Sequence, residues 1–100
     1  MRLSRVTLIF LILLVSSLCV YAQQTITSTL MHNGIERNYI VYVPASYDGT
    51  ENVPLILNFH GYTSNAFEQM NYGDFRGIAD REGFIVVHPN GTVDLVGNTH

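Results

Sequence analysis

The sequence predicts an α/β fold because two apolar runs flank a stretch with helical signals. Residues 55–59 (LILNF) and 84–88 (FIVVH) are apolar at successive positions, which is typical of interior strands in a sheet covered on both faces. An antiparallel hairpin is predicted before the first run. A hairpin followed by a β-α-β unit indicates a mixed, mostly parallel sheet with helices packed against it.

The hairpin is predicted from two segments joined by a tight turn. Residues 25–30 are rich in β-branched side chains, and residues 35–43 form the returning strand. Between them lies Asn33-Gly34, a dipeptide that strongly favours a two-residue hairpin turn. Polar residues 45–54 then form the loop that leads to the first apolar strand.

The stretch between the two apolar strands contains start and stop signals for helices. Asn65 is placed as an N-cap, with Glu68 three residues later in capping-box position. Residues 71–73 (NYG) interrupt the pattern, and a second helical segment is predicted over residues 74–82. Gly83 is placed as the left-handed residue that ends it. The last ten residues have the composition of a loop.

Residues 1–22 have the pattern of a secretory signal peptide. Two arginines precede the apolar run at residues 8–15, the small polar residues Ser16 and Ser17 follow it, and the segment closes with Val20-Tyr21-Ala22. We expect cleavage between Ala22 and Gln23, and an extracellular or periplasmic protein. A membrane anchor is the alternative, but the run is shorter than the ~20 residues that span a bilayer. We therefore expect no stable membrane anchor.

Charge and cysteine content exclude several functions for residues 23–100. Three arginines and eight acidic residues give this segment a net charge of −5, so it lacks the basic face of a nucleic-acid-binding protein. The single cysteine, Cys19, lies in the leader, which excludes disulfide scaffolds and thiol catalysis beyond it. Because the histidines lack metal-ligand spacing, we expect no metal and no cofactor. They are His32, His60, His88 and His100.

The candidate functional feature is the junction after the first apolar strand. The strand ends in His60-Gly61, and a short polar loop leads to the helix start at Asn65. Such a junction leaves backbone N–H groups unpaired, and these can stabilise negative charge. We predict that the Tyr62 N–H is one donor of an oxyanion hole, supported by His60 and Gly61. The alternative is an ordinary strand-to-helix turn in which Gly61 has only a geometric role.

Three consecutive stretches carry a resemblance to a known family. They are residues 34–49 (GIERNYIVYVPASYDG), 53–67 (VPLILNFHGYTSNAF) and 75–92 (FRGIADREGFIVVHPNGT). In this order and spacing the chain resembles the secreted polyhydroxybutyrate depolymerase and feruloyl esterase group of α/β-hydrolases. The resemblance covers roughly residues 31–98. It implies that residues 23–100 form the N-terminal part of an α/β-hydrolase fold, which is incomplete.

The resemblance also implies a catalytic triad that this chain does not contain. Such enzymes use a serine in a G-x-S-x-G motif, followed by an aspartate and then a histidine. After the leader the serines are Ser28, Ser46 and Ser64, and none lies in that motif. We therefore expect the triad beyond His100, and we expect a fragment that is inactive alone. The strand at residues 55–59 would then have a bare edge.

The function implied by the resemblance is hydrolysis of carboxylic esters by a serine esterase. A polyester, a feruloyl ester and an acetylated sugar are all open as substrates. One alternative is a small secreted binding module without enzymatic activity, in which tyrosines contact carbohydrate. The tyrosines considered for this role are Tyr39, Tyr42, Tyr47, Tyr62 and Tyr72. A second alternative is a peptidase of the same fold, because fold does not fix the bond that is cleaved.

The remaining polar residues are predicted to be structural. His88 is expected in the core or at its rim. Asn90-Gly91-Thr92 fits a glycosylation sequon, but Asn-Gly more often marks a turn. The charges of the second helical segment are expected to be solvated, with arginines as partners of the acids. These residues are Asp74, Asp80 and Glu82, with Arg76 and Arg81.

Overall fold

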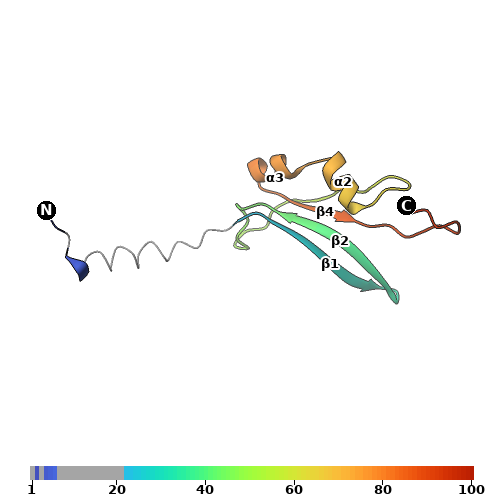
Figure 1. Cartoon of the computed structure of the whole chain (residues 1–100), viewed down its shortest axis with the longest axis horizontal. Coiled ribbons are helices and arrows are strands. Elements are labelled where there is room, and N and C mark those ends of the chain that lie inside the picture. The colour runs from blue at the N-terminus through green and yellow to red at the C-terminus, as the bar shows by residue number, and fades with distance from the viewer. Residues whose placement is uncertain (1, 3, 7–21) are drawn as a thin grey trace.

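The computed structural model describes residues 2, 4–6 and 22–100. Most of the expected signal peptide therefore lies outside the described residues. Within the described part, no helix has the length and apolar character needed to cross a membrane. The elements follow the chain in the order β1 (Gln24–His32), β2 (Ile35–Val43), β3 (Leu55–Leu57), α2 (Ala66–Tyr72), α3 (Arg76–Glu82) and β4 (Ile85–Pro89) (Figure 1).

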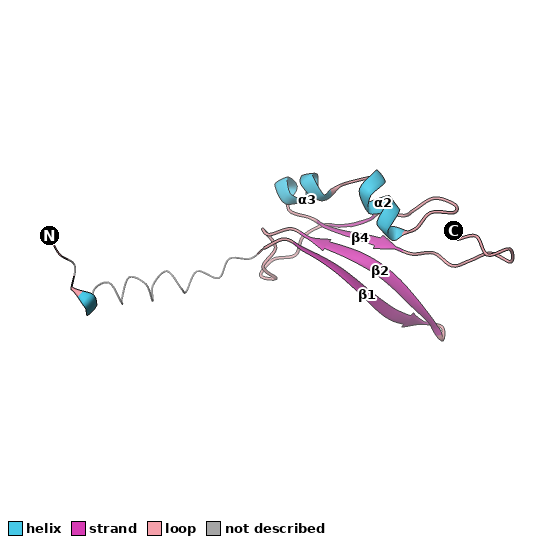
Figure 2. Ribbon diagram, in the orientation of Figure 1, coloured by secondary structure: helices cyan, strands magenta, loops and turns pink. Residues whose placement is uncertain are grey.

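The four strands form one mixed sheet with the order β1-β2-β4-β3. Strand β2 pairs antiparallel with β1 on one side and with β4 on the other, whereas β3 pairs parallel with β4. Both helices lie on the same side of the sheet, as Figure 2 shows. The α/β class, with a hairpin followed by a β-α-β unit, is therefore confirmed.

Several local predictions are confirmed at the level of the backbone. Asn33 and Gly34 have φ angles of 50° and 76°, the left-handed pair that a type I′ hairpin turn requires. Gly83 ends α3 with a φ of 73°, and its N–H donates to the Ala79 carbonyl at 2.8 Å. The Asn65 side chain accepts from the Glu68 N–H at 2.9 Å, as an N-cap does.

The structure corrects the prediction in four places. Strand β3 spans three residues rather than residues 55–59, and β4 includes Pro89. Helix α3 begins at Arg76 because the Asp74 carboxylate accepts the Arg76 N–H at 3.0 Å and stays outside the helix. The reciprocal half of the capping box does not form, because the Glu68 carboxylate accepts instead from the Ser64 hydroxyl at 2.8 Å.

The core lies between the sheet and its two helices. Alternate side chains of β2 and β4 point toward the helices, which follows from the two-residue period of a strand. Fully buried Val86 packs with Tyr42, Ala79 and Phe84 in one cluster. A second cluster joins β2 to α2, and its buried members are Ile40, Ala66 and Met70.

The opposite face of the sheet is apolar and uncovered in the described part of the chain. Leu55 and Leu57 are 59% and 53% exposed. Together with Leu30, Tyr39 and Val87 they line a shallow hollow on this face. No strand pairs with the outer edge of β3 among the described residues. Within this part of the chain the outer edge of β3 and the adjoining face are therefore exposed.

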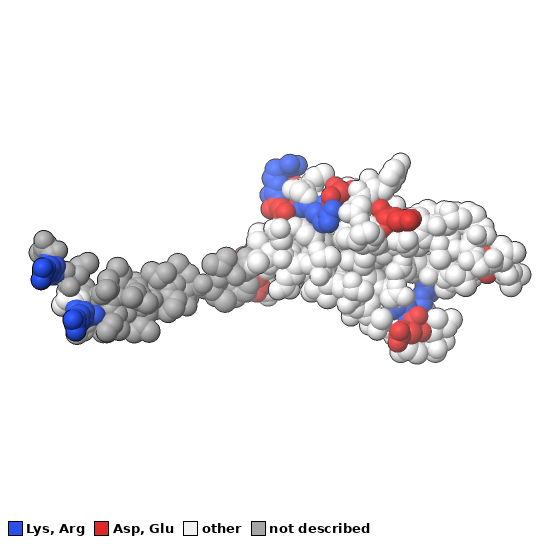
Figure 3. Space-filling model, viewed as in Figure 1, with Lys and Arg blue, Asp and Glu red and all other residues white. Residues whose placement is uncertain are grey.

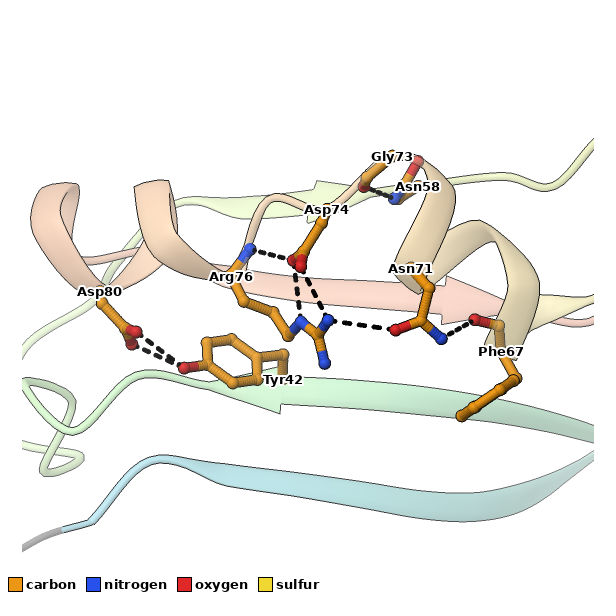
Figure 4. Close-up of polar contacts among 8 residues, drawn as sticks. All are labelled: Tyr42, Asn58, Phe67, Asn71, Gly73, Asp74, Arg76 and Asp80. Carbon is orange, nitrogen blue, oxygen red and sulfur yellow. Dashed lines mark hydrogen bonds and ion pairs between the residues drawn. The ribbon is translucent and has the colours of Figure 1, made fainter.

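Polar side chains tie the helices to the strands (Figure 4). Asn58 follows β3 and is only 8% exposed. Its amide nitrogen donates to the Gly73 carbonyl at 2.9 Å, and its amide oxygen accepts from the Gln69 side chain at 2.9 Å. Because both polar groups of Asn58 are satisfied, its burial is tolerated. Asn58 thereby fixes the end of α2 beside β3.

The acidic residues near α3 are less uniform than predicted. Asp74 does pair with Arg76 at 2.7 Å, and this hydrogen bond lowers the pKa of Asp74 to about 2. Arg81 likewise pairs with Glu82. Asp80, predicted to be a solvated charge, accepts the Tyr42 hydroxyl on both carboxylate oxygens at 2.8 and 2.9 Å. Burial and this contact raise the pKa of Tyr42 to about 12.

His88 is confirmed as a core residue and has an unusual environment. It has no exposed surface, and neither ring nitrogen has a hydrogen-bond partner among the described residues. Burial lowers the pKa of His88, and the nearby Arg76 guanidinium lowers it further, while Asp74 acts in the opposite direction. The imidazole is therefore neutral in the folded protein at pH 7.

We expect the folded protein to lose stability below a pH of about 6.5, the ordinary pKa of a histidine. Because the pKa of His88 is lower in the folded protein than in the unfolded chain, the unfolded chain binds more protons in this range. The free energy of unfolding therefore decreases as the pH is lowered. His88→Leu should reduce this slope between about pH 6.5 and 5. Urea denaturation at several pH values measures it, with exposed His32→Gln as the control. An unchanged slope in His88→Leu would contradict the prediction. Asp74, with a pKa of about 2, acts only at lower pH.

Candidate functional site

The predicted oxyanion loop forms a tight turn between β3 and α2. The Ser64 N–H donates to the Gly61 carbonyl at 3.1 Å, and Thr63 has a left-handed φ of 67°. These are the features of a type II turn with Tyr62 at its second position and Thr63 at its third. Glycine or asparagine normally occupies that third position. A β-branched residue there is a backbone outlier, and such outliers concentrate at functional sites.

The backbone of Gly61 does not adopt an unusual conformation, although the tight turn was expected to depend on this glycine. Its φ lies outside the left-handed range, so the residue that requires an unusual conformation is Thr63. The space beside Gly61 is open among the described residues, because an added Cβ would meet no atom within 4 Å. Open space at this position would allow a bound group to come close to the backbone.

The three amides that follow Gly61 differ in their hydrogen bonds. The Thr63 N–H donates to the Thr99 carbonyl at 2.7 Å, and the Ser64 N–H is used within the turn. The Tyr62 N–H has no acceptor among residues 22–100. Tyr62 therefore holds a free donor at the position predicted from the sequence, and its role in stabilising an oxyanion stays a prediction.

His60 connects this loop to the segment that follows β4. Its Nε2 accepts the Gly91 N–H at 3.0 Å, and its Nδ1 lies 2.7 Å from the Gly61 carbonyl oxygen. Because Nε2 accepts a hydrogen bond, the neutral ring must carry its proton on Nδ1, which donates to Gly61. These contacts agree with a loop-shaping role for His60, with both ring nitrogens engaged.

A hollow of about 240 Å³ lies beside His60. Its wall includes the aromatic ring of Phe59 and the guanidinium of Arg37, which donates to the Asn90 carbonyl at 3.2 Å. Figure 3 shows that charged side chains gather over the two helices and near the β1–β2 turn, with a largely uncharged surface between them. The lining of the hollow combines the apolar residues Phe59 and Pro89 with cationic Arg37 and with polar residues such as His60 and Asn90.

The Tyr62 side chain extends from the turn to Asp94. The ring is 62% exposed, and its hydroxyl donates to Asp94 Oδ2 at 2.9 Å. Asp94 also accepts the backbone N–H groups of Val96 and Asn98. The Asn98 N–H in particular lowers the pKa of Asp94, and the Tyr62 hydroxyl contributes. Sequence reasoning missed Asp94, although an aspartate three residues before Gly97 is a recognisable turn signal.

The last ten residues are mostly loop, as predicted, but they contain a small antiparallel bridge. Val93 pairs with Thr99, and the turn between them closes with a bond from the Gly97 N–H to the Asp94 carbonyl at 3.1 Å. The Thr99 hydroxyl donates to the Ser64 carbonyl at 2.6 Å. This segment is therefore packed directly against the predicted oxyanion loop.

The structure favours a structural role for Asn90 over a glycosylated one. Its side-chain oxygen accepts the Ala66 N–H at 2.7 Å, at the start of α2. Its side-chain nitrogen donates to the Asn38 side chain, and its backbone N–H donates to the Asn38 carbonyl at 3.0 Å. A glycan on this nitrogen would have to disrupt contacts that join β2, β4 and α2.

No catalytic triad is assembled within the described part of the chain. Ser64 donates its hydroxyl to Glu68 at 2.8 Å, and no serine hydroxyl is hydrogen-bonded to a histidine among residues 22–100. Ser28 lies on β1, and Ser46 lies in the loop after β2. The described residues also include no cluster of three or more histidine, cysteine or acidic side chains placed to hold a metal ion.

Known structures share this fold. S-formylglutathione hydrolase from Agrobacterium tumefaciens matches 72% of the chain with a TM-score of 0.62 and 23% identity. The fluorophosphonate-binding serine hydrolase FphF from Staphylococcus aureus matches 68% with a TM-score of 0.52 and 20% identity. The matched regions are 26% and 30% of those chains. The chain therefore has the fold of the N-terminal part of an α/β-hydrolase.

A curated protein gives a sequence match. The chain is 34% identical over 68 residues to the bifunctional acetylxylan esterase/xylanase XynS20E of Neocallimastix patriciarum. The match includes 68% of this chain but spans only a tenth of that protein's length. No protein-family model matches the chain. The structural matches show the α/β-hydrolase fold, and the sequence match is to a protein named as an esterase. Neither singles out the polyhydroxybutyrate depolymerase and feruloyl esterase group.

We expect Thr63→Gly to stabilise the protein, because it removes a left-handed residue with a Cβ, a conformation that costs about 1–2 kcal/mol. The greater flexibility of glycine in the unfolded chain offsets part of this gain. Thr29→Gly, in the exposed strand β1, should instead destabilise the protein. Urea denaturation measures the change in the free energy of unfolding for each variant. Destabilisation by both substitutions would show that the Thr63 backbone is unstrained.

Proposed function

We propose that residues 23–100 are the N-terminal portion of a secreted serine hydrolase that cleaves carboxylic esters. The observation that carries the proposal is the Tyr62 N–H, which has no acceptor among the described residues and lies in a tight turn between β3 and α2 of an α/β-hydrolase sheet. The sequence match to a protein named as an acetylxylan esterase supports ester chemistry.

In the proposed mechanism this chain supplies electrostatic stabilisation, and later residues supply the nucleophile. A serine beyond His100 attacks the ester carbonyl carbon, and a histidine takes the serine proton while an aspartate orients it. Negative charge then develops on the carbonyl oxygen. The Tyr62 N–H and the N–H that follows the serine donate hydrogen bonds to this oxygen in the transition state. Collapse of the tetrahedral intermediate expels the alcohol, and water then releases the acid.

The proposed substrate is an acetyl ester on a plant polysaccharide. It rests on the printed activity of the curated relative. Polyesters such as polyhydroxybutyrate and feruloyl esters present the same carbonyl chemistry to the Tyr62 N–H, and they are the alternatives suggested by the sequence resemblance. The hollow beside His60, with its aromatic and cationic lining, lies close to this loop.

The secretion proposal rests on the composition of residues 1–22 and on the exposure of Ala22 and Gln23, which lie immediately before the first strand. A signal peptidase requires an accessible, extended cleavage site. Expression in a secreting host, followed by mass spectrometry of the exported protein, should give a mature N-terminus at Gln23. An exported protein that retains residue 1, or one that stays in the membrane fraction, would contradict the proposal.

The oxyanion role of Tyr62 can be separated from the role of its side chain. A type II turn accepts proline at its second position, so Tyr62→Pro removes the N–H with little change to the turn. In the full-length protein we expect Tyr62→Pro to lower kcat about 100- to 1,000-fold. Acetate release from acetylated xylan is the measurement.

Tyr62→Ala is the matched control, because it removes the same side chain and keeps the N–H. Its kcat should stay much closer to that of the wild-type protein. Equal kcat values for Tyr62→Pro and Tyr62→Ala would overturn the donor assignment. A wild-type protein that releases ferulate or hydroxybutyrate but no acetate would overturn the substrate proposal and leave the donor assignment testable.

A further inference from the structure

The proposed oxyanion turn has a backbone that needs support from outside the turn. Thr63 holds a left-handed φ of 67°, although its branched Cβ disfavours that conformation. Residues in such conformations persist when surrounding contacts over-determine them. The internal bond from the Ser64 N–H to the Gly61 carbonyl, at 3.1 Å, is common to turns of every hydrogen-bonded type. It does not by itself select the left-handed form.

Thr99 supplies two contacts to the turn from outside it. Its carbonyl accepts the Thr63 N–H at 2.7 Å, and its hydroxyl donates to the Ser64 carbonyl at 2.6 Å. One residue therefore holds two successive residues of the turn, as acceptor for the first and donor for the second. The peptide that precedes Thr63 is the one that joins it to Tyr62, so fixing Thr63 also restricts the orientation of Tyr62.

Thr99 is itself held in place by the segment to which it belongs. Val93 pairs with Thr99 across a short bridge, and the His100 N–H donates to the Thr92 carbonyl at 3.0 Å. The Asp94 carboxylate accepts the Val96 and Asn98 N–H groups at 3.0 and 2.8 Å. These contacts hold residues 92–100 in one arrangement, so Thr99 is in a fixed position next to the turn.

From these contacts we infer that Thr99 is a positioning residue for the oxyanion turn, acting through its hydroxyl and carbonyl on Ser64 and Thr63. The inference rests on the proposed function of the Tyr62 N–H. In this inference Thr99, which is distant from the turn in sequence, holds the Tyr62 N–H in the orientation that the transition state requires. Thr99 itself does not touch the substrate.

The hydroxyl contact is tested by an isosteric pair of variants in the full-length protein. Thr99→Val keeps the shape and loses the donor to Ser64, whereas Thr99→Ser keeps the donor. We expect Thr99→Val to lower kcat about 10-fold, with KM changed by less than about twofold, because a small displacement of a catalytic donor acts on the transition state. Thr99→Ser should restore kcat to near the wild-type value. Thr29→Val, at an exposed position in β1, is the matched control and should leave both constants unchanged.

Three results would overturn the inference. These are an unchanged kcat in Thr99→Val, an effect confined to KM, and a loss in Thr99→Ser equal to that in Thr99→Val. If Thr99→Val does not fold, the double variant Thr63→Gly/Thr99→Val decides, because glycine adopts the turn without support. The double variant should recover the kcat of Thr63→Gly, and failure to recover it would count against positioning.

Amide exchange separates this inference from the proposed function. Thr99→Val keeps the carbonyl that accepts the Thr63 N–H and removes the hydroxyl that holds the neighbouring Ser64 carbonyl. Because the loss of this second contact loosens the turn, the Thr63 N–H should exchange faster in Thr99→Val than in the wild-type or Thr29→Val protein. This measurement requires no substrate. If the wild-type protein cleaves no ester while exchange at Thr63 responds as expected, the proposed function fails and the structural part of the inference stands. If exchange at Thr63 is unchanged, the inference itself fails.

Discussion

The burial of strand β4 is the constraint on which the rest of the structure depends. This strand pairs with β2 on one side and β3 on the other, and its inward side chains, Val86 and His88, have no exposed surface. Burying an apolar side chain such as that of Val86 stabilises the fold by roughly 1.5–3 kcal/mol. The chain between β3 and β4 must therefore form helices that cover this face. Because β3 and β4 are parallel, the segments that follow them emerge at the same edge of the sheet. The contacts between His60 and Gly91 and between Thr63 and Thr99 follow from that arrangement.

The parts of the fold that the sequence predicts are those set by local physics. The left-handed angles at Asn33 and Gly34 and the cap at Asn65 each depend on one or two residues and their neighbours. The apolar runs also predict strands, because the pattern extends over several neighbouring positions and does not depend on any single residue. Strand ends were predicted less well. Strand β3 ends after Leu57 because its parallel register with β4 runs only from Leu55 to Leu57.

Polar partners across the fold could not be predicted in this way. Asn58 reads as part of an apolar strand, and only the approach of α2 brings the Gly73 carbonyl to its amide. Asp80 lies on a helix that looks solvated, and only the packing of α3 over β2 brings the Tyr42 hydroxyl to it. The same limit applies to the candidate site. The junction after β3 predicted a free N–H at Tyr62, but the left-handed φ of Thr63 has no signal in its residue type, and sequence reasoning placed the unusual backbone at Gly61.

In the proposed full-length hydrolase, the bare outer edge of β3 has a consequence for how this part of the chain behaves before a later strand covers it. Backbone groups along such an edge pair with any extended segment, including the same strand of another molecule. Leu55 and Leu57, exposed on the adjoining face, make that pairing more favourable because it also removes apolar surface from water. The rate of such encounters rises with concentration, whereas covering the edge from within one molecule does not depend on it. The yield of folded protein therefore depends on the competition between a bimolecular pairing of edges and a unimolecular folding step, and dilution favours the unimolecular step.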